Sequence, residues 1–155
     1  MSYRDKLRRH LSEYKRLHLG IGTPGVFRYR GREVQYQHIL PLANASANLF
    51  AEAEPSASAF LAAHPGKRHR YFHHLNSSQA FAFNLFFPYF SGEPEAASAL
   101  LRAFGQKGVL AGWEPEAVPA PDEETNVDAI WDNHRWGADF LRGQAFRGAL
   151  RQGRQ

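Results

Sequence analysis

The amino-acid sequence predicts a single domain of the α/β (α+β) class, in which helices come first and a sheet begins in the last third of the chain. A length of 155 residues fits one domain with a core of moderate size. Apolar residues make up 43% of the chain and aromatic residues 14%, which is enough to build that core. Helical periodicity dominates up to residue 108, and segments typical of strands follow it.

The N-terminal region predicts a helix followed by a hairpin. Apolar residues at helical spacing form one stripe along residues Tyr3–Leu17. The stripe consists of Leu7, Leu11, Tyr14 and Leu17. The glycine-rich segment Gly20–Gly25 breaks the helix, and it lacks the Gly-Lys-Ser/Thr of a phosphate-binding loop. Alternation then predicts a hairpin over Val26–Pro41 that turns at Gly31.

Two short helices are expected after the hairpin. The Ala-rich segment that begins at Ala43 is expected to be helical up to Pro55. Ser56 is then expected to cap a second helix that ends at His64. A loop over residues 64–69 follows.

The most apolar stretch, Asn76–Phe90, predicts a central buried helix, because its apolar side chains cover the whole helical circumference. Ser77 and Ser78 are the candidate N-caps, and Pro88 is expected to end the helix. The amides of this helix share one arc and need hydrogen-bonding partners if they are buried. These amides are Asn76, Gln79 and Asn84.

An amphipathic helix over Glu93–Gly108 is expected to end at Gly105 or Gly108. Segments 109–118 and 125–131 then predict two strands, separated by the turn-rich stretch "PAPDEE". The sheet therefore begins only after the helices.

Composition excludes several classes of protein. No apolar run approaches the about 18 residues of a membrane span, and the first residues lack the apolar stretch of a secretory signal. The absence of cysteine excludes disulfides and thiolate metal sites. We therefore expect a cytoplasmic protein without a membrane partner.

Charge is distributed unevenly along the chain. Residues 1–32 hold nine Lys/Arg against two acidic residues, a balance of +7. Residues 114–139 hold eight Asp/Glu against one Arg, a balance of −7, and residues 141–155 hold four Arg and no acid. A basic face beside an acidic pocket suits a protein that holds phosphates while it gathers a cation. The alternative is a solvated basic helix and a solvated acidic loop.

Carboxylates gather on the two expected strands and on the turn between them. They are Glu114, Glu116, Glu123, Glu124 and Asp128. Mg²⁺ prefers oxygen ligands and usually takes one or two protein carboxylates together with substrate phosphate oxygens. Such an ion can activate water and stabilise the charge that builds on a phosphodiester. Asp128 stands between two apolar residues of its strand, so a metal site in a cleft and a solvent-facing acid are both open interpretations.

Cations and an aromatic ring cluster in the segment "KRHRYFHH", just before the apolar helix. The nucleic-acid-binding candidates are Lys67, Arg68, Arg70 and Tyr71. The three cations would contact the nucleic-acid backbone, and the Tyr71 ring would stack on a base. The alternative is a surface loop. His69 and His73 stand four apart, as in a helical metal pair, but a zinc site needs a third ligand and no HExxH pattern supplies it.

Two motifs resemble the PD-(D/E)XK nuclease superfamily, and more narrowly a bacterial restriction-endonuclease-like family. They are "HLNSSQAFAFNLFFPYF" and "EETNVDAIW". The resemblance covers roughly Tyr71–Phe140, with weaker similarity upstream. It implies a mixed sheet flanked by helices, DNA as the partner and Mg²⁺ as the cofactor. Asp128 matches the motif Asp, which is both catalytic and a metal ligand, and Glu116 and Glu124 are the further candidate ligands. Gln79 matches a helix position that we assign to nucleic-acid binding, and the alternative is that its side chain supports a loop.

The resemblance also implies a Glu-x-Lys pattern on the neighbouring strand, where Glu holds the metal and Lys orients or deprotonates the attacking water. This pattern would follow Phe140, but it is absent, and no Lys follows Lys107. Phe140–Phe146 can be encoded as TTT CTG CGA GGT CAA GCT TTC, which reads Phe-Cys-Glu-Val-Lys-Leu-Ser after a shift of one base. We therefore expect that an insertion or deletion near Phe140 replaced the catalytic strand with an unrelated tail.

The sequence as a whole is interpreted as one domain over residues 1–155. It comprises a basic helical and hairpin region at 1–66, a partial nuclease-like core at 67–140 and an Arg/Gly/Gln-rich tail at 141–155. The predicted function is that of a Mg²⁺-dependent DNA endonuclease by lineage, with little or no cleavage because half of the site is missing. The alternatives are a small basic nucleic-acid-binding or regulatory module without catalysis, and a structural protein whose Arg-rich tail is genuine.

Overall fold

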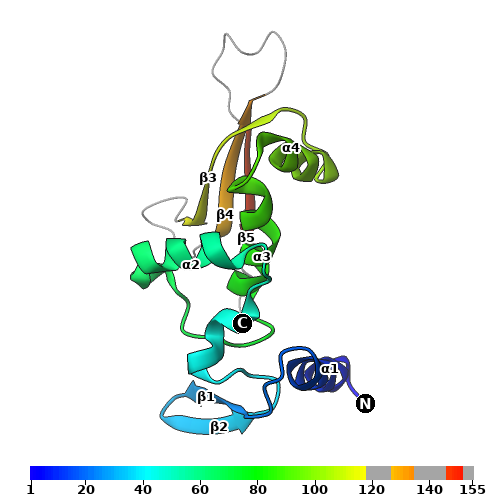
Figure 1. Cartoon of the computed structure of the whole chain (residues 1–155), viewed down its shortest axis with the longest axis vertical. Helices are drawn as coiled ribbons and strands as arrows, with labels where there is room; N and C mark the ends of the chain where they lie inside the picture. The colour runs from blue at the N-terminus through cyan, green and yellow to red at the C-terminus, as the bar shows by residue number, and fades with distance from the viewer. Residues whose placement is uncertain (118–126, 135–145, 152–155) are drawn as a thin grey trace.

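The structure, a computed structural model of the whole chain, describes residues 1–117, 127–134 and 146–151, with side chains described over residues 1–115. The described elements form a mixed α+β fold with a two-stranded and a three-stranded sheet (Figure 1). The helices precede the larger sheet in the chain, which confirms the predicted order. In the described part of the chain, no helix combines the length and the apolar character needed to cross a bilayer.

Helix α1 (Tyr3–Leu17) has the predicted bounds. The Ser2 side chain caps it by accepting a hydrogen bond from the Asp5 amide at 3.2 Å. Lys15 is the one buried residue of α1. Its Nζ donates to the carbonyl oxygens of Thr23 at 2.7 Å and Ile39 at 3.0 Å. This buried ammonium group joins the end of α1 to the chain on both sides of the hairpin.

Strands β1 (Gly25–Tyr29) and β2 (Arg32–Tyr36) form the predicted antiparallel hairpin. Arg30 and Gly31 connect them with φ values of 48° and 75°, so both turn residues lie in the left-handed region that a type I′ turn requires. Gly25 admits no side chain, because a Cβ atom there would lie 2.3 Å from the Leu40 carbonyl oxygen. The hairpin prediction, including its turn, is confirmed.

The segment after the hairpin differs from the prediction. A short 3-10 helix, η1 (Leu42–Asn48), stands where a longer helix was expected, and the chain then turns into α2 (Glu54–Ala63). The prediction that Ser56 caps α2 is wrong, because the helix begins two residues earlier, at Glu54. Pro55 lies in the first turn, where its missing N–H costs nothing and its fixed φ favours the helix. A second 3-10 turn, η2 (Pro65–Lys67), follows.

Helix α3 (Ser78–Phe90) is the centre of the fold. The Ser77 hydroxyl caps it by accepting from the Ala80 amide at 3.3 Å, as predicted. The prediction that Pro88 ends the helix is wrong, because α3 continues to Phe90. The buried phenylalanines of its last two turns pack into the core, and this packing offsets the hydrogen bond that proline cannot donate. They are Phe83, Phe86, Phe87 and Phe90.

Helix α4 (Pro94–Ala103) ends before Gly105, whose φ of 73° confirms the predicted C-terminal glycine. Strands β3 (Val109–Ala117), β4 (Val127–His134) and β5 (Phe146–Arg151) follow and form an antiparallel sheet in the order β3-β4-β5. The first two strands were predicted. The third was not, since it lies in the Arg/Gly/Gln-rich tail.

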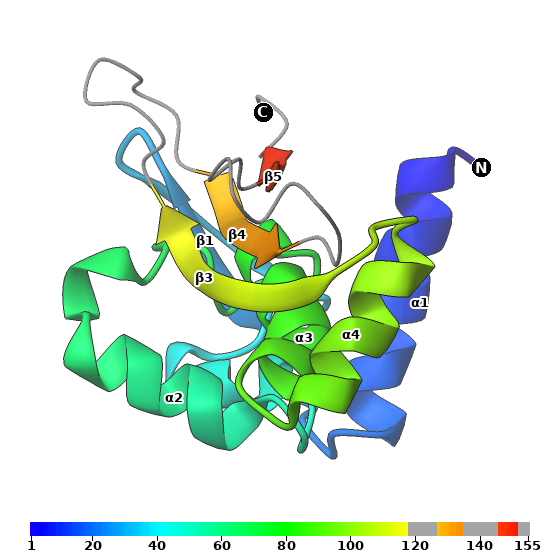
Figure 2. The same ribbon diagram turned by 90° about the horizontal axis from the view of Figure 1, so that it is seen from above.

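Helices α3 and α4 lie along one face of the three-stranded sheet (Figure 2). The Trp113 ring of β3 meets the rings of Phe87 and Phe90 edge-on, at centroid distances of 4.8 and 5.6 Å. These contacts fix which face of β3 is turned to the helices. The strands of the described residues are all antiparallel, so the parallel pairing of a mixed sheet is not seen within them.

Candidate functional site

The register of β3 against β4 places two of the candidate carboxylates opposite each other. Pro115 pairs with Ala129, and Ala117 pairs with Val127. Glu116 and Asp128 are the residues between these pairs, so they occupy facing positions. Residues directly opposite in an antiparallel pair lie on the same face of the sheet, with Cβ atoms about 5 Å apart. The sequence had grouped these acids, and the backbone register brings two of them together.

Asp128 also stands at an irregularity of the sheet. Against β5, Val127 pairs with Arg151 and Ala129 pairs with Leu150. Asp128 is therefore the extra residue of a β-bulge. Bulges are frequent beside active sites, because the local twist changes the direction of a side chain.

Glu114 lies on the face of β3 that is turned away from α3. Trp113 contacts α3, and side chains alternate along a strand, so Glu114 lies on the opposite face from Trp113. Oε1 of Glu114 lies 3.9 Å from Nζ of Lys67 in η2. The pair is long and the Glu114 side chain is 67% exposed, so its contribution to stability is small. The contact does show that the predicted basic loop borders the acid-bearing face.

The two arginines of this loop are exposed, and each lies over an aromatic ring. The Arg68 guanidinium lies 5.3 Å from the Phe72 ring centre, and that of Arg70 lies 4.4 Å from the Tyr71 ring centre. Cation–π contacts of this kind restrict the arginine side chains while leaving their donors available to an anion. The geometry therefore suits phosphate binding.

Gln79 lies beneath the loop and is 1% exposed. Its Oε1 accepts from the His69 amide at 2.8 Å, and its Nε2 donates to the Lys67 carbonyl at 2.7 Å. Both ends of the amide thus fix the backbone on either side of Arg68. The requirement that a buried amide has partners is confirmed. The amide acts on the loop backbone, and its direct contact with nucleic acid remains a prediction.

Asn84 satisfies the same requirement by joining α3 to η1. Its Oδ1 accepts from the Phe50 amide at 2.7 Å, and its Nδ2 donates to the Asn48 carbonyl at 2.9 Å. Asn48 in turn donates from Nδ2 to the carbonyls of Phe72 and His74. The network sets the position of the chain that follows the basic loop. Sequence analysis missed Asn48, which stands in an Ala-rich segment.

Tyr71 connects the basic loop to the hairpin. Its hydroxyl donates to the Arg28 carbonyl at 3.1 Å, and its ring lies 5.5 Å from Phe27 and 4.9 Å from His74. The stacking of Tyr71 on a base remains a prediction, because the ring is half-buried among these neighbours.

Three buried histidines lie where the hairpin meets the body: His38, His73 and His74. Burial, followed by the positive charges of His73, His38 and His69, lowers the pKa of His74 to about 4. In the described part of the chain, Nδ1 of His73 and Nε2 of His74 have no hydrogen-bond partner. Within residues 1–117, 127–134 and 146–151, no group of three or more His, Cys, Asp or Glu side chains is arranged to hold a metal ion. The zinc alternative therefore gains no support from these residues.

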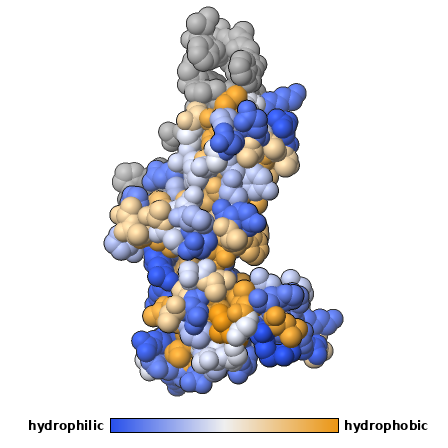
Figure 3. Space-filling model, in the orientation of Figure 1, coloured by the Kyte–Doolittle hydropathy of each residue, from blue (hydrophilic) through white to orange (hydrophobic). Residues whose placement is uncertain are grey.

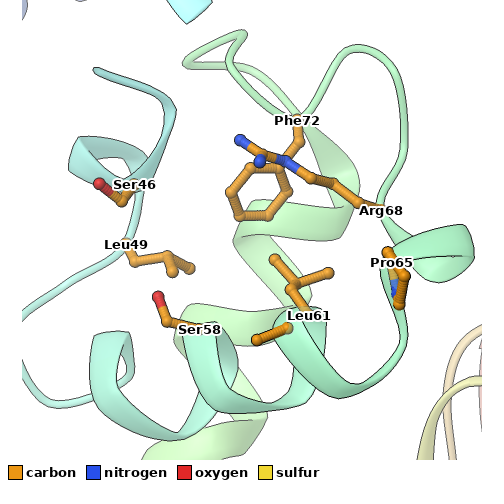
Figure 4. Close-up of a pocket in the computed structure, with 8 residues that line it drawn as sticks. Ser46, Leu49, Ser58, Leu61, Pro65, Arg68 and Phe72 are labelled. Atoms are coloured by element: carbon orange, nitrogen blue, oxygen red, sulfur yellow. The ribbon is translucent and has the colours of Figure 1, made fainter. Parts of the chain in front are cut away.

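A pocket of about 460 Å³ opens between η1, α2 and the basic loop (Figure 4). Arg68 and Phe72 line it on one side, and Leu49 and Leu61 lie across from them. The pocket is mainly apolar with one cation and two serine hydroxyls in its lining. It was not predicted, because its walls come from three separate segments.

Three predicted site residues lie beyond the described side chains: Glu116, Glu124 and Asp128. Glu124 falls in a segment outside the described residues, as does the neighbouring candidate Glu123. Glu116 and Asp128 are placed by their backbone alone.

An α+β fold with acids on adjoining strands and a basic loop at their edge is typical of a restriction-endonuclease-like protein. A family model described as "Restriction Endonuclease associating with ARP" matches residues 8–139, and the chain belongs to that family. The match confirms the resemblance and extends it upstream to include most of α1 and the hairpin. No curated protein and no solved structure matches the chain.

Proposed function

We propose that this chain descends from Mg²⁺-dependent DNA endonucleases and that its site is built around Asp128. The observation that carries the proposal is the register that sets Glu116 opposite Asp128. Two facing carboxylates form the oxygen donor set that Mg²⁺ takes from proteins, and Glu124 is the third candidate ligand. When bound, Mg²⁺ would activate water and stabilise the phosphodiester as charge builds on it. Lys67, Arg68 and Arg70 would hold the DNA backbone beside this face.

We further propose that the chain as it stands cleaves DNA slowly or not at all. Residues 141–155 contain neither Glu nor Lys, so the Glu-x-Lys half of the family site is missing. The parts of a catalytic unit are strongly non-additive, so one remaining half restores little of the rate. Asp128 and Glu116 would still bind the metal, whereas the group that positions the attacking water would be lost.

A shift of reading frame near Phe140 is the proposed origin of this loss. Its support is that the family match stops at residue 139, one residue before the position inferred from the codons. The nucleotide sequence across residues 135–155 tests it directly. The frame displaced by one base should encode Glu-x-Lys close to Phe140, and an immediate stop codon or the absence of those codons would refute the shift.

A nuclease assay on the purified protein tests the activity. With plasmid DNA and Mg²⁺, we expect no cleavage above that of an Asp128→Ala control. A gene with the frame restored should give a protein that cuts in Mg²⁺ and not in EDTA. Strong cutting by the present chain that Asp128→Ala abolishes would overturn the proposed inactivity and would show that another acid completes the site.

The second candidate is a basic nucleic-acid-binding module without catalysis, favoured by the exposed arginines of the hairpin and the loop. For this candidate, DNA binding should be steeply salt-dependent, independent of Mg²⁺ and unchanged by Asp128→Ala. Binding that is tightened by Mg²⁺ and weakened by Asp128→Ala would favour the nuclease lineage.

A further inference from the structure

We propose that the β1–β2 hairpin enters the major groove of duplex DNA as a two-stranded ribbon and contributes to sequence recognition. The proposal rests on the proposed function only in that DNA is the partner. It depends on neither Asp128 nor a metal ion.

The shape of the hairpin fits this role. It lies at the same end of the molecule as α1, opposite α4 (Figure 1). Residues 28–35 are all exposed, so both strands are accessible around the turn. The space-filling view shows hydrophilic surface at the outer edges of the hairpin and α1, with hydrophobic side chains between them (Figure 3). The major groove is about 12 Å wide and admits a two-stranded ribbon, whereas the minor groove, at about 6 Å, does not.

The two faces of the ribbon differ in chemistry. The Phe27 ring packs against Tyr71 and His74, which fixes one face against the body. Alternation and the printed register place three polar residues on the other face, away from Phe27. They are Arg28, Glu33 and Gln35. Arginine, glutamate and glutamine are the side chains that pair with guanine, cytosine and adenine edges in the major groove. In the free protein, Arg28 and Glu33 form an exposed ion pair with each other.

The turn adds positive charge where the ribbon would meet the phosphates. Arg30 and Arg32 stand at and beside the tip, and both are exposed. Arg30 has a φ of 48°, a conformation that an L-residue with a long side chain rarely adopts and that Asn or Gly accepts readily. The type I′ turn requires a positive φ at this position, so the turn itself sets the backbone conformation. The choice of arginine over Asn or Gly carries a backbone cost that a DNA contact would account for.

Charge and chemistry favour duplex DNA over an acidic protein. The outer face of the ribbon presents a glutamate and a glutamine beside its arginine. The glutamate would repel an acidic protein surface, whereas in the major groove it can accept from the amino group of cytosine. The family match includes the hairpin, so the ribbon belongs to the family's own fold.

The first experiment measures binding of a short mixed-sequence duplex by fluorescence anisotropy in EDTA, between about 50 and 200 mM salt. The double variant Arg30→Asn/Arg32→Gln should weaken binding. It should also reduce the magnitude of the negative slope of log affinity against log salt by about two, one for each lost phosphate contact. Arg102→Gln is the matched control, because it removes one exposed arginine from α4, at the other end of the molecule. The control should keep the wild-type slope. Arg30→Asn alone should not lower the melting temperature, since Asn tolerates the turn geometry.

The second experiment identifies the groove. A duplex whose cytosines carry a glucosylated hydroxymethyl group has its major groove filled, and we expect an affinity loss of about tenfold or more. Netropsin, which occupies the minor groove, should leave binding within about twofold. If the glucosylated duplex binds as tightly as the unmodified one, or if netropsin displaces the protein, the ribbon proposal is overturned.

The outcomes separate this proposal from the proposed function. If the ribbon variant keeps the wild-type affinity and slope, the ribbon proposal fails and DNA binding by another surface stands. If the wild-type chain binds no duplex DNA, both proposals fail. If the ribbon variant loses DNA binding while a frame-restored protein shows no Mg²⁺-dependent cleavage, the ribbon stands and the nuclease lineage of the site fails.

Discussion

His74 shows how a single buried side chain makes the fold sensitive to acid. It packs against Phe27 of the hairpin, 5.8 Å between ring centres, and against Tyr71 of the loop. Burial is the main cause of its low pKa of about 4, and the nearby histidines add to it. A neutral ring suits this apolar position, whereas a protonated ring would bring charge into the contact between the hairpin and the body.

We expect the stability to fall as the pH is lowered from 6.5 towards 4. The unfolded chain takes up a proton at His74 near pH 6.5, while the folded chain resists protonation until about pH 4, so the stabilisation is complete above pH 6.5. Between pH 7 and pH 5 the loss should be about 2 kcal/mol or less, measured by urea unfolding. His74→Phe should remove most of this difference, and exposed His10→Gln should not. An equal loss in His74→Phe and the wild type would contradict this origin.

Gln79 has a structural role that can be separated from its predicted contact with nucleic acid. Gln79→Leu leaves the Lys67 carbonyl and the His69 amide without their partner, at a cost of about 1–3 kcal/mol. We expect the basic loop to be cut faster by trypsin in this variant. Asn76→Ala, on an exposed amide near the start of the same helix, should change neither the unfolding free energy nor the cleavage rate.

Individual partners of this kind could not be predicted from the sequence. The sequence does require that Gln79 and Asn84 find partners, because both fall on a strongly apolar helix. Their partners are backbone groups of Lys67, His69 and Phe50, which only the tertiary fold brings near. For the same reason, the contact of Lys67 with Glu114 joins positions that no local pattern relates.

At the scale of elements, the N-terminus of α3 offers a direct test of capping. Ser77→Ala removes the side-chain acceptor for the Ala80 amide and should destabilise the protein by about 1 kcal/mol. Ser78→Ala is the matched control, since Ser78 is the first helical residue and alanine is favoured there. Thermal unfolding of the two variants should separate them, and equal melting temperatures would exclude Ser77 as the effective cap.

Elements governed by local chemistry were predicted well. Helix α1 follows its apolar stripe, the hairpin follows its alternation, and the Gly105 terminus of α4 follows from a conformation that glycine favours. Elements governed by tertiary packing were not. Pro88 remains inside α3 because the phenylalanines around it are buried, and β5 forms because the edge of β4 offers hydrogen bonds to a sequence of weak strand character.

At the scale of the whole molecule, Mg²⁺ should change the stability of the three-stranded sheet. The change should depend on the β3–β4 register that sets Glu116 opposite Asp128. Like charges directly opposite in a sheet destabilise it, so Glu116→Gln should raise the unfolding free energy in EDTA by about 0.2–1 kcal/mol. Saturating Mg²⁺ stabilises a folded state that binds it, so the metal should cancel or reverse this gain.

Glu116→Gln should stabilise the protein in EDTA, and Mg²⁺ should cancel or reverse that effect. Glu114→Gln is the control for this dependence on Mg²⁺. It removes a charge from the same strand and the same face, but Glu114 stands opposite Ile130. Its effect on stability should be small and should not depend on Mg²⁺. If Glu114→Gln and Glu116→Gln respond alike to the metal, the facing pair is not the metal site.

The sequence predicts the composition of the candidate site, and it does not predict how these residues are arranged. The sequence groups the acids at 114–128 and the cations at 67–70. The register that makes Glu116 and Asp128 opposite each other is a property of two paired strands, and a slip of one residue would place them on different faces. The link between the loop and the hairpin through Tyr71 likewise depends on residues more than 40 positions apart.

That link has a geometric consequence for any DNA bound by this fold. Residues 67–74 form one short stretch of chain whose first residue reaches Glu114 and whose aromatic residues carry the hairpin. Amide hydrogen bonds from Gln79 and Asn48 fix this stretch near both of its ends. The stretch therefore holds the hairpin at a fixed distance from β3. If the hairpin and the acids act on DNA as proposed, we expect a relative with an intact site to cut at a constant number of base pairs from the bases that the hairpin touches.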